Sequence, residues 1–313
     1  MGKQPLVSAI TIFLNGEQFI EEAIASICAQ TYDNWELLLV DDGSSDKSTQ
    51  IARIYAAQCP GKIRYLEHRG HQNRGMSASR NIGVAHAKGE FIAFLDADDV
   101  WMPNKLAEQV ALAQAYPEAA MLYGRTLIWH SWTNKPEDEN RDFVLDLGVR
   151  HGQLAPPPRL FLTLLENKAQ SPTTCNALIR RDVVIKVGGC EESFRGMYED
   201  QVLFAKIELQ WPVYVAAQCW AKYRQHSANC SAARFTAESY CSTRLPFLNW
   251  LSAHLIRTGV ARTSPVWKAV QTHTWLCRHP RYFQLANQIC FRKKQLAELF
   301  ARIRADRQTF ALS

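Results

Sequence analysis

Residues 90–101 read EFIAFLDADDVW, an apolar run that ends in a cluster of carboxylates. The apolar part, residues 90–95, predicts a buried strand because it is short and rich in Phe, Ile and Leu. Asp96, Asp98 and Asp99 follow directly, although acids are rarely buried in a protein core. The stretch therefore predicts a buried strand that delivers charged groups to its carboxyl end.

Segments with strand and helix patterns alternate around this stretch through the first 125 residues. Such alternation implies crossover connections and a mostly parallel sheet flanked by helices, as in Rossmann-like folds, so the predicted fold class is α/β. The predicted strands are residues 6–14, 35–40, 62–66, 90–95 and 119–123, and the predicted helices are residues 17–29, 46–57, 77–87 and 105–115.

The rest of the chain is less regular. Residues 133–158 include three consecutive prolines and predict a long surface loop. From residue 233 onward the pattern is helical, with breaks expected near Pro246, Gly259, Pro265 and Pro280. We therefore expect a body of residues 1–240, with halves that meet near residue 125, and a helical C-terminal appendage of residues 241–313.

The composition, 47% hydrophobic and 21% charged over 313 residues, is typical of soluble globular proteins and excludes collagen-like and wholly disordered classes. The sequence has no apolar run of 18 residues and no signal-peptide pattern, so we expect a cytoplasmic protein. Residues 241–313 carry 12 Lys and Arg against two acids, a charge of +10 that leaves residues 1–240 at −4. This basic region predicts either an anion-binding surface or a solvated helical face.

A second pair of carboxylates, Asp41 and Asp42, follows the predicted strand 35–40. Ligands of open parallel sheets bind beyond the carboxyl ends of the strands, where both acidic clusters are expected. The spacing of Asp96 and Asp98 lets two carboxylates converge on one Mg²⁺ or Mn²⁺, which would in turn hold a diphosphate. Arg80, just inside a predicted helix, could balance phosphate charge or pair with an acid. A solvated acidic turn is the alternative for each cluster.

Three motifs occur in a fixed order: VDDGSSD at residues 40–46, NRGMSASRNIG at residues 73–83 and FLDADDVW at residues 94–101. Together they resemble the family-2 glycosyltransferases of the GT-A fold. YEDQ at residues 198–201 and YRQH at residues 223–226 are similar to two further motifs of this family. The resemblance covers roughly residues 6–231 and departs at Ile12, where the family commonly has proline.

The resemblance implies transfer of a sugar, with inversion, from a nucleotide-diphosphate donor that is commonly UDP-linked. It implies that residues 1–240 are the catalytic domain, with the nucleotide-sugar half in residues 1–125 and the acceptor half in residues 126–240. Asp200 would be the general base, and Glu199 would orient the base or the acceptor. Asp98, Asp96 and His226 would hold a divalent metal, Mn²⁺ or Mg²⁺. The implied donor-binding residues are Asn15, Asp41, Asp42, Arg80, Asp96 and Asp98.

Two other functions remain open from the sequence. A nucleotidyltransferase could use a related sheet, but it should have a Gly-rich phosphate loop where residues 13–17 read FLNGE. A non-catalytic module could bind polyanions or membrane through the basic region and would not need Asp98 or Asp200. We expect no nucleic-acid partner, because no nucleic-acid-binding motif accompanies the charge.

The expected partners are therefore a nucleotide-sugar donor and a saccharide or lipid-linked acceptor. An apolar stripe with Arg244 and Arg257 nearby also predicts peripheral contact with the inner face of a membrane. Packing of this region on the catalytic domain is the alternative. The apolar residues of this stripe are Phe247, Leu248, Trp250, Leu251 and Leu255.

Overall fold

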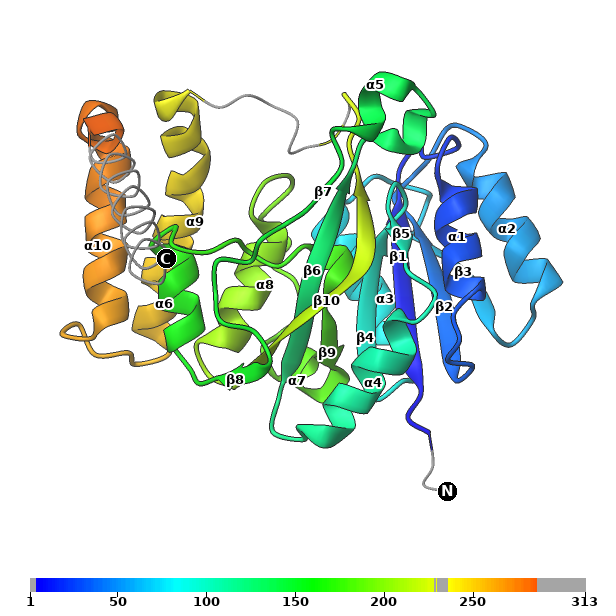
Figure 1. The fold of residues 1–313 in the computed structure, drawn as a ribbon, viewed down its shortest axis with the longest axis horizontal. Coiled ribbons are helices and arrows are strands. Elements are labelled where there is room, and N and C mark those ends of the chain that lie inside the picture. Colours follow the sequence, from blue (N-terminus) through cyan, green and yellow to red (C-terminus); the bar gives the residue numbers. More distant parts are fainter. Residues whose placement is uncertain (1–3, 228, 230–235, 286–313) are drawn as a thin grey trace, which may run out of the picture. The chain divides into compact units, whose positions relative to one another are not determined.

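The computed structural model describes residues 4–285, apart from residue 228 and residues 230–235 (Figure 1). It divides into two compact units, residues 1–233 and residues 234–313. The first unit is an α/β domain, and the second contains the helices α9 (Ala237–Arg257) and α10 (Pro265–Arg278), followed by the helical residues 280–285.

The strands of the first unit are β1 (Val7–Phe13), β2 (Trp35–Asp41), β3 (Ile63–Glu67), β4 (Phe91–Asp96), β5 (Val100–Trp101), β6 (Met121–Trp129), β7 (Phe143–Val144), β8 (Gln153–Ala155), β9 (Leu178–Arg180) and β10 (Val213–Arg224). They form one sheet in the order β3-β2-β1-β4-β9-β6-β10-β5, with β7 paired to β6 and β8 paired to β10. Strands β3, β2, β1 and β4 are parallel, while β9 is antiparallel to both of its neighbours. The predicted, mostly parallel sheet is confirmed.

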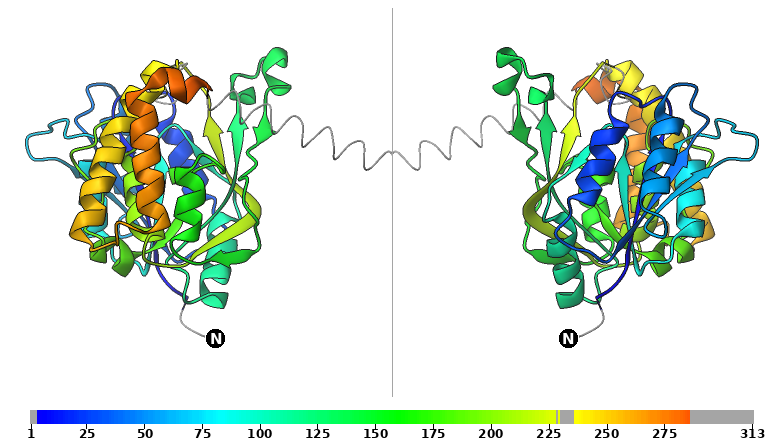
Figure 2. Two further views of the ribbon diagram at one scale, coloured as in Figure 1. Left: turned by 90° about the vertical axis from the view of Figure 1, so that its left-hand side faces the viewer. Right: turned by 90° about the vertical axis from the view of Figure 1, so that its right-hand side faces the viewer.

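Helices lie on both sides of this sheet (Figure 2). One hydrophobic core joins it to α1 (Ile20–Cys28) and α4 (Lys105–Ala115), and a second joins its other face to α3 (Met76–His86), α7 (Arg181–Lys186) and α8 (Glu199–Glu208). All seven residues of β1 and of β2 are buried, as expected for parallel strands covered on both faces. The remaining helices of this unit are α2 (Ser48–Gln58), α5 (Pro136–Glu139) and α6 (Arg159–Leu165).

Two sequence-based expectations were wrong. Residues 133–158 are not one long loop, because they contain α5, β7 and β8, and the last two add short edge strands to the sheet. Pro246 does not end a helix but lies inside α9 (Ala237–Arg257). Proline has no N–H, so the helical hydrogen bond to the Ser242 carbonyl is missing. Because Ser242 is an exposed residue, water can replace this bond and the helix continues.

The second unit pairs α9 with α10 (Pro265–Arg278), which begins at a proline capped by Ser264. Four apolar side chains that predicted a membrane-facing stripe, Phe247, Leu248, Leu251 and Leu255, are buried. No helix in the described part of the chain is both long and apolar enough to cross a membrane. Membrane contact through the basic region stays a prediction, and half of its cations fall in residues 286–313, outside the described residues.

Strand β10 is irregular where it passes β6. Val215 pairs with Tyr123 and Ala221 pairs with Thr126, so six residue steps of β10 lie opposite three of β6. Extra residues of this kind make a β-bulge, which bends a strand and redirects its side chains. Beyond the bulge, the end of β10 lies next to the acidic turn that follows β4.

Gly124 lies directly against this bulge, so a side chain there should destabilise the fold. A Cβ at Gly124 would lie 2.4 Å from the Gln218 carbonyl oxygen. We expect Gly124→Ala to lower the free energy of unfolding in urea by about 1–3 kcal/mol, the usual effect of overpacking. The control Gly196→Ala, where nothing lies within 4 Å of the added Cβ, should change it little. Equal stability of the two variants would show that the bulge can shift.

Candidate active site

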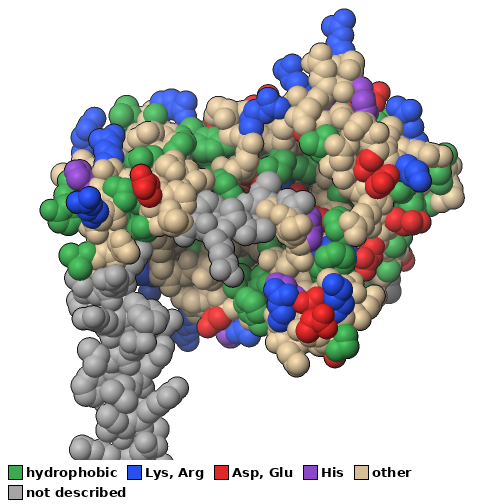
Figure 3. All heavy atoms as spheres, turned by 90° about the horizontal axis from the view of Figure 1, so that it is seen from above, with side chains coloured by type: hydrophobic (Ala, Val, Ile, Leu, Met, Phe, Trp, Pro, Cys, Tyr) green, Lys and Arg blue, Asp and Glu red, His purple; other side chains and the backbone are tan. Residues whose placement is uncertain are grey.

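The strand register brings the two acidic clusters to the same edge of the sheet. Strand β1 lies between β2 and β4, and its last residues pair with acids on both sides, Phe13 with Asp41 and Ile12 with Asp96. This edge, at the carboxyl ends of the parallel strands, faces the viewer in Figure 3, where acidic and basic side chains lie beside apolar ones. Open parallel sheets bind ligands at such an edge.

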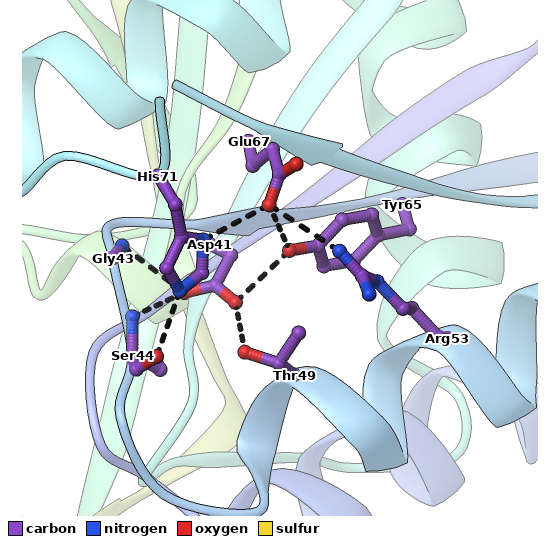
Figure 4. Close-up of polar contacts among 8 residues, drawn as sticks. All are labelled: Asp41, Gly43, Ser44, Thr49, Arg53, Tyr65, Glu67 and His71. Carbon is purple, nitrogen blue, oxygen red and sulfur yellow. Dashed lines mark hydrogen bonds and ion pairs between the residues drawn. The ribbon is translucent and has the colours of Figure 1, made fainter. Parts of the chain in front are cut away.

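Asp41, one of the expected donor contacts, is the last residue of β2. Its side chain is fully buried. One oxygen accepts the backbone N–H groups of Gly43 (3.1 Å) and Ser44 (2.8 Å), and the other accepts the Thr49 hydroxyl at 2.5 Å (Figure 4). The Tyr65 hydroxyl is also 3.1 Å away. The carboxylate of Asp41 therefore shapes the loop after β2 through hydrogen bonds from the protein itself.

Asp42 and Asn15 also fasten loops at this edge. Asp42 accepts the backbone N–H groups of Arg74 (2.7 Å) and Gly75 (3.0 Å), which fixes the start of α3. Asn15 accepts the Ser45 N–H at 2.8 Å, and its own N–H donates to the Ser44 hydroxyl at 3.0 Å. These bonds connect the ends of β1, β2 and β3, and they leave Asp42 and Asn15 with unused hydrogen-bonding capacity.

Arg80 is buried among carboxylates. Its side chain is 2% exposed, and Nη2 lies 2.8 Å from Asp96 Oδ1 while Nη1 lies 3.6 Å from Glu199 Oε1. Burial alone would lower the pKa of Arg80, but Asp96 and Glu199 raise it, so the guanidinium stays charged. Nε and Nη1 are buried without a hydrogen-bond partner, so the cation has donors left over. The structure thus joins α3, the end of β4 and the start of α8 around one positive charge.

Glu199 and Asp200 occupy the first turn of α8, where the helix dipole favours acids. Tyr198, with φ of +73°, turns the chain sharply into this helix. Burial raises the pKa of both carboxyls, and the charge of Asp200 raises that of Glu199 further, while Arg80 opposes the shift in each. Asp200 accepts the Gln201 N–H at 2.7 Å and lies 3.4 Å from the Thr174 hydroxyl. Carboxyls with raised pKa values suit proton transfer near neutral pH.

Asp98 and His226 form a second contact at this edge, from segments far apart in sequence. His226 Nε2 lies 3.0 Å from Asp98 Oδ2, and the ring is held 4.8 Å from the ring of Phe19. Asp98 and Asp96 remain partly exposed, each with 29% of its side chain accessible.

Sequence reasoning missed Arg224, which organises this contact. Its Nε donates to the Asp98 carbonyl oxygen at 2.7 Å, its backbone N–H donates to Asp99 at 2.9 Å, and its Nη2 pairs with Glu22 at 2.5 Å. Its guanidinium is enclosed at cation–π distance by Phe19, Trp129 and Trp132. The YRQH motif contained the signal, but the aromatic partners come from other segments and were not recognisable.

The chemistry of these side chains fits a divalent metal shared with a ligand. No group of three or more His, Cys, Asp or Glu side chains in the described residues is arranged to hold a metal on its own. Mg²⁺ and its analogues commonly use one or two protein carboxylates, with substrate phosphates completing the coordination shell. Asp96 and Asp98 supply two such carboxylates: both are partly exposed on one turn, and the imidazole of His226 lies against Asp98.

The ion-pair cluster of Arg80 yields a stability prediction. We expect Arg80→Met to lower the free energy of unfolding by about 3 kcal/mol, because Asp96 and Glu199 would lose the cation that compensates their burial. The matched control is Arg141→Met, since Arg141 pairs with Asp138 at 2.6 Å but is 58% exposed. Urea unfolding of both variants at neutral pH measures the difference. A loss no larger than that of the control would contradict a stabilising role for the buried pair.

The strand order and the acidic turn after β4 define a GT-A-type α/β fold, which solved glycosyltransferases share. The mannosyltransferase PcManGT from Pyrobaculum calidifontis, in complex with GDP-Man and Mn²⁺, is similar with a TM-score of 0.59 and 19% identity, over 90% of this chain and 72% of that one. Residues 1–349 of S. aureus TarS, in complex with UDP-GlcNAc, give a TM-score of 0.59 and 20% identity, over 77% and 65% of the two chains. The likeness at these identities establishes the fold.

The chain belongs to the family described as Glycosyl transferase family 2, whose sequence pattern matches residues 8–188. An uncharacterized glycosyltransferase of Nostoc sp. PCC 7120 is 28% identical over 259 residues, which cover 81% of this chain and 76% of that protein. The putative glycosyltransferase EpsE of Bacillus subtilis is 39% identical over 116 residues, 37% of this chain and 41% of EpsE. The predicted family is confirmed, and so is the glycosyltransferase class.

The name of a third relative states both its sugar donor and its acceptor. It is the Escherichia coli UDP-Glc:alpha-D-GlcNAc-diphosphoundecaprenol beta-1,3-glucosyltransferase WfgD, 40% identical over 107 residues. The match covers 34% of this chain and 40% of WfgD, so it spans less than half the length of that relative, as it does for EpsE.

Proposed function

We propose that this protein transfers a sugar from a nucleoside-diphosphate sugar to an acceptor hydroxyl, with inversion at the anomeric carbon. The observation that carries the proposal is the convergence of Asp96, Glu199 and Asp200 on the buried Arg80, at the ligand-binding edge of a family-2 fold. The donor is assigned to residues 1–125 and the acceptor to residues 126–240. The proposed donor contacts are Asn15, Asp41, Asp42, Arg80, Asp96 and Asp98.

The reaction needs a proton acceptor on the side of the incoming hydroxyl. In a single displacement the acceptor oxygen bonds to the anomeric carbon, and the bond from that carbon to the diphosphate oxygen breaks, with its electron pair leaving on the diphosphate. The proton of the hydroxyl passes to the carboxylate of Asp200, which acts as general base. Glu199, held 3.6 Å from the Arg80 guanidinium, orients this base.

Asp98, helped by Asp96 and His226, would hold a divalent cation, Mn²⁺ or Mg²⁺. When bound, such a cation neutralises the charge that develops on the leaving diphosphate. Arg224 keeps Asp98 in place through the backbone carbonyl, and Arg80 keeps Asp96 in place through its carboxylate. The side chains of Arg80 and Arg224 are buried, so they hold Asp96 and Asp98 in position before a donor binds.

UDP is the proposed nucleotide, since WfgD is named for a UDP-sugar and TarS was solved with UDP-GlcNAc. The proposed acceptor is a saccharide, and the name of WfgD supports a lipid-linked one. A lipid-linked acceptor would agree with peripheral contact between the basic C-terminal region and a membrane.

Thermal unfolding in the presence of nucleotides tests this proposal. We expect UDP with Mn²⁺ to raise the melting temperature, since a ligand at about 100 times its Kd adds about 2.7 kcal/mol of stability. The shift should require the metal and should disappear in Asp98→Ala. GDP, CDP and dTDP are the comparison nucleotides. The control variant is Asp182→Ala, which removes an exposed carboxylate that pairs with Lys186. Absence of a shift with all four nucleotides would contradict the proposed donor class.

Asp200→Asn separates catalysis from binding. We expect kcat to fall by about 10²–10⁴, because the amide cannot accept the proton, while the Kd for UDP stays within a few-fold. Because the pKa values of Glu199 and Asp200 are raised, wild-type kcat/KM should increase with pH, with an acid limb above the ordinary carboxyl range. Glu199→Gln should move this limb to lower pH. Unchanged kcat in Asp200→Asn would exclude Asp200 as the base.

A further inference from the structure

The imidazole ring of His71 lies between two groups that can only accept hydrogen bonds. His71 is in the loop after β3, with a left-handed φ of +53°. Nε2 lies 2.7 Å from the carbonyl oxygen of Ser44, and Nδ1 lies 2.9 Å from Glu67 Oε2 (Figure 4). A carbonyl and an ionised carboxylate have no proton to give, so both ring nitrogens must donate, and only the imidazolium form does this.

This ring joins the loop after β3 to the loop after β2, which carries Asp42 and contacts Asn15. Ser44 belongs to the loop between β2 and α2, and its hydroxyl accepts the backbone N–H of Asn15. On the same side, Asp42 accepts two N–H groups from the loop between β3 and α3. The loops approach so closely at Gly43 that a Cβ there would lie 2.9 Å from the His71 carbonyl oxygen. A change at His71 is therefore transmitted to Asn15 and Asp42.

The charged groups around the ring favour its protonated form. Glu67 faces it from β3 and Asp41 faces it from β2. Glu67 Oε2 also lies 3.5 Å from Nη2 of Arg53, on α2, and accepts the Tyr65 hydroxyl at 2.7 Å. The bond to Ser44 and then the bond to Glu67 raise the pKa of His71 above its ordinary value of 6.5. The side chain is 37% exposed, so it can exchange protons with solvent.

We propose that His71 is a positioning residue whose imidazolium locks the loop after β3 to the loop that carries Asp42, so that loss of one ring proton loosens both loops and weakens nucleoside-diphosphate binding. The inference rests on the proposed function, since it deepens the account of the donor site. Because the pKa is raised on folding, the bridge is complete below 6.5 and is lost as the pH rises through the folded value. Nucleotide binding should weaken with rising pH over this range.

Calorimetric titration with UDP, and separately with GDP, in Mn²⁺ tests the inference between about pH 6 and about pH 9. In the wild type we expect Kd to rise on the order of tenfold across one titration step, the effect of losing one hydrogen bond to a charged group. His71→Gln should abolish that step. Glu67→Gln should move its midpoint to lower pH, because the ring loses its anionic partner. The control His86→Gln, at an exposed histidine of α3 bonded to the Ile82 carbonyl, should keep the wild-type profile.

Nitrogen NMR of the His71 ring gives a readout that does not depend on nucleotide. Two protonated ring nitrogens at pH 6.5, with loss of one proton at higher pH, would support the inference, and a single protonated nitrogen at pH 6.5 would overturn it. A pH step that persists in His71→Gln, with nucleotide still bound, would refute the inference alone. If no variant binds either nucleotide at any pH, the proposed function fails and the inference fails with it.

Discussion

The buried guanidinium of Arg80 is the interaction on which the rest of the site depends. It lies among Asp96, Glu199 and Asp200, which come from the end of β4 and the start of α8. Carboxylates so close together repel one another and lose solvation, and a buried cation is the direct compensation. Arg80 reaches them because α3 packs closely on β1, where a Cβ at Gly83 would lie 2.4 Å from the Ile10 side chain.

The sequence was sufficient to predict strands β1 to β4 and β6, helices α1 to α4, and the acids at the ends of β2 and β4. These features are encoded locally, by hydrophobic period and by turn residues, and helix α4 has the predicted bounds of 105–115. The convergence of acids at one edge also followed from sequence, because parallel strands end on the same side. The edge strands β7 and β8 were missed, since two or three residues are too short to show a period.

The remaining features depend on contacts between distant segments. Arg224 finds its aromatic partners near residues 19 and 130, and Asp41 is enclosed by donors from β3 and α2 as well as from its own loop. A motif names the residue types at a site but not which of them are already occupied by protein donors. Asp41 and Asp42 are adjacent and chemically identical, yet only the structure shows that Asp41 bonds to its own loop and to Thr49, whereas Asp42 bonds to the start of α3.

The bulge in β10 separates two parts of one strand. Before it, Val213–Val215 pair with the short edge strand β8; after it, the chain reaches Arg224 and the acidic turn. Because the extra residues lie between these two parts, the pairing of β10 with β8 is separated from the contacts of Arg224. One strand therefore serves both the edge of the sheet at β8 and the geometry around Asp98.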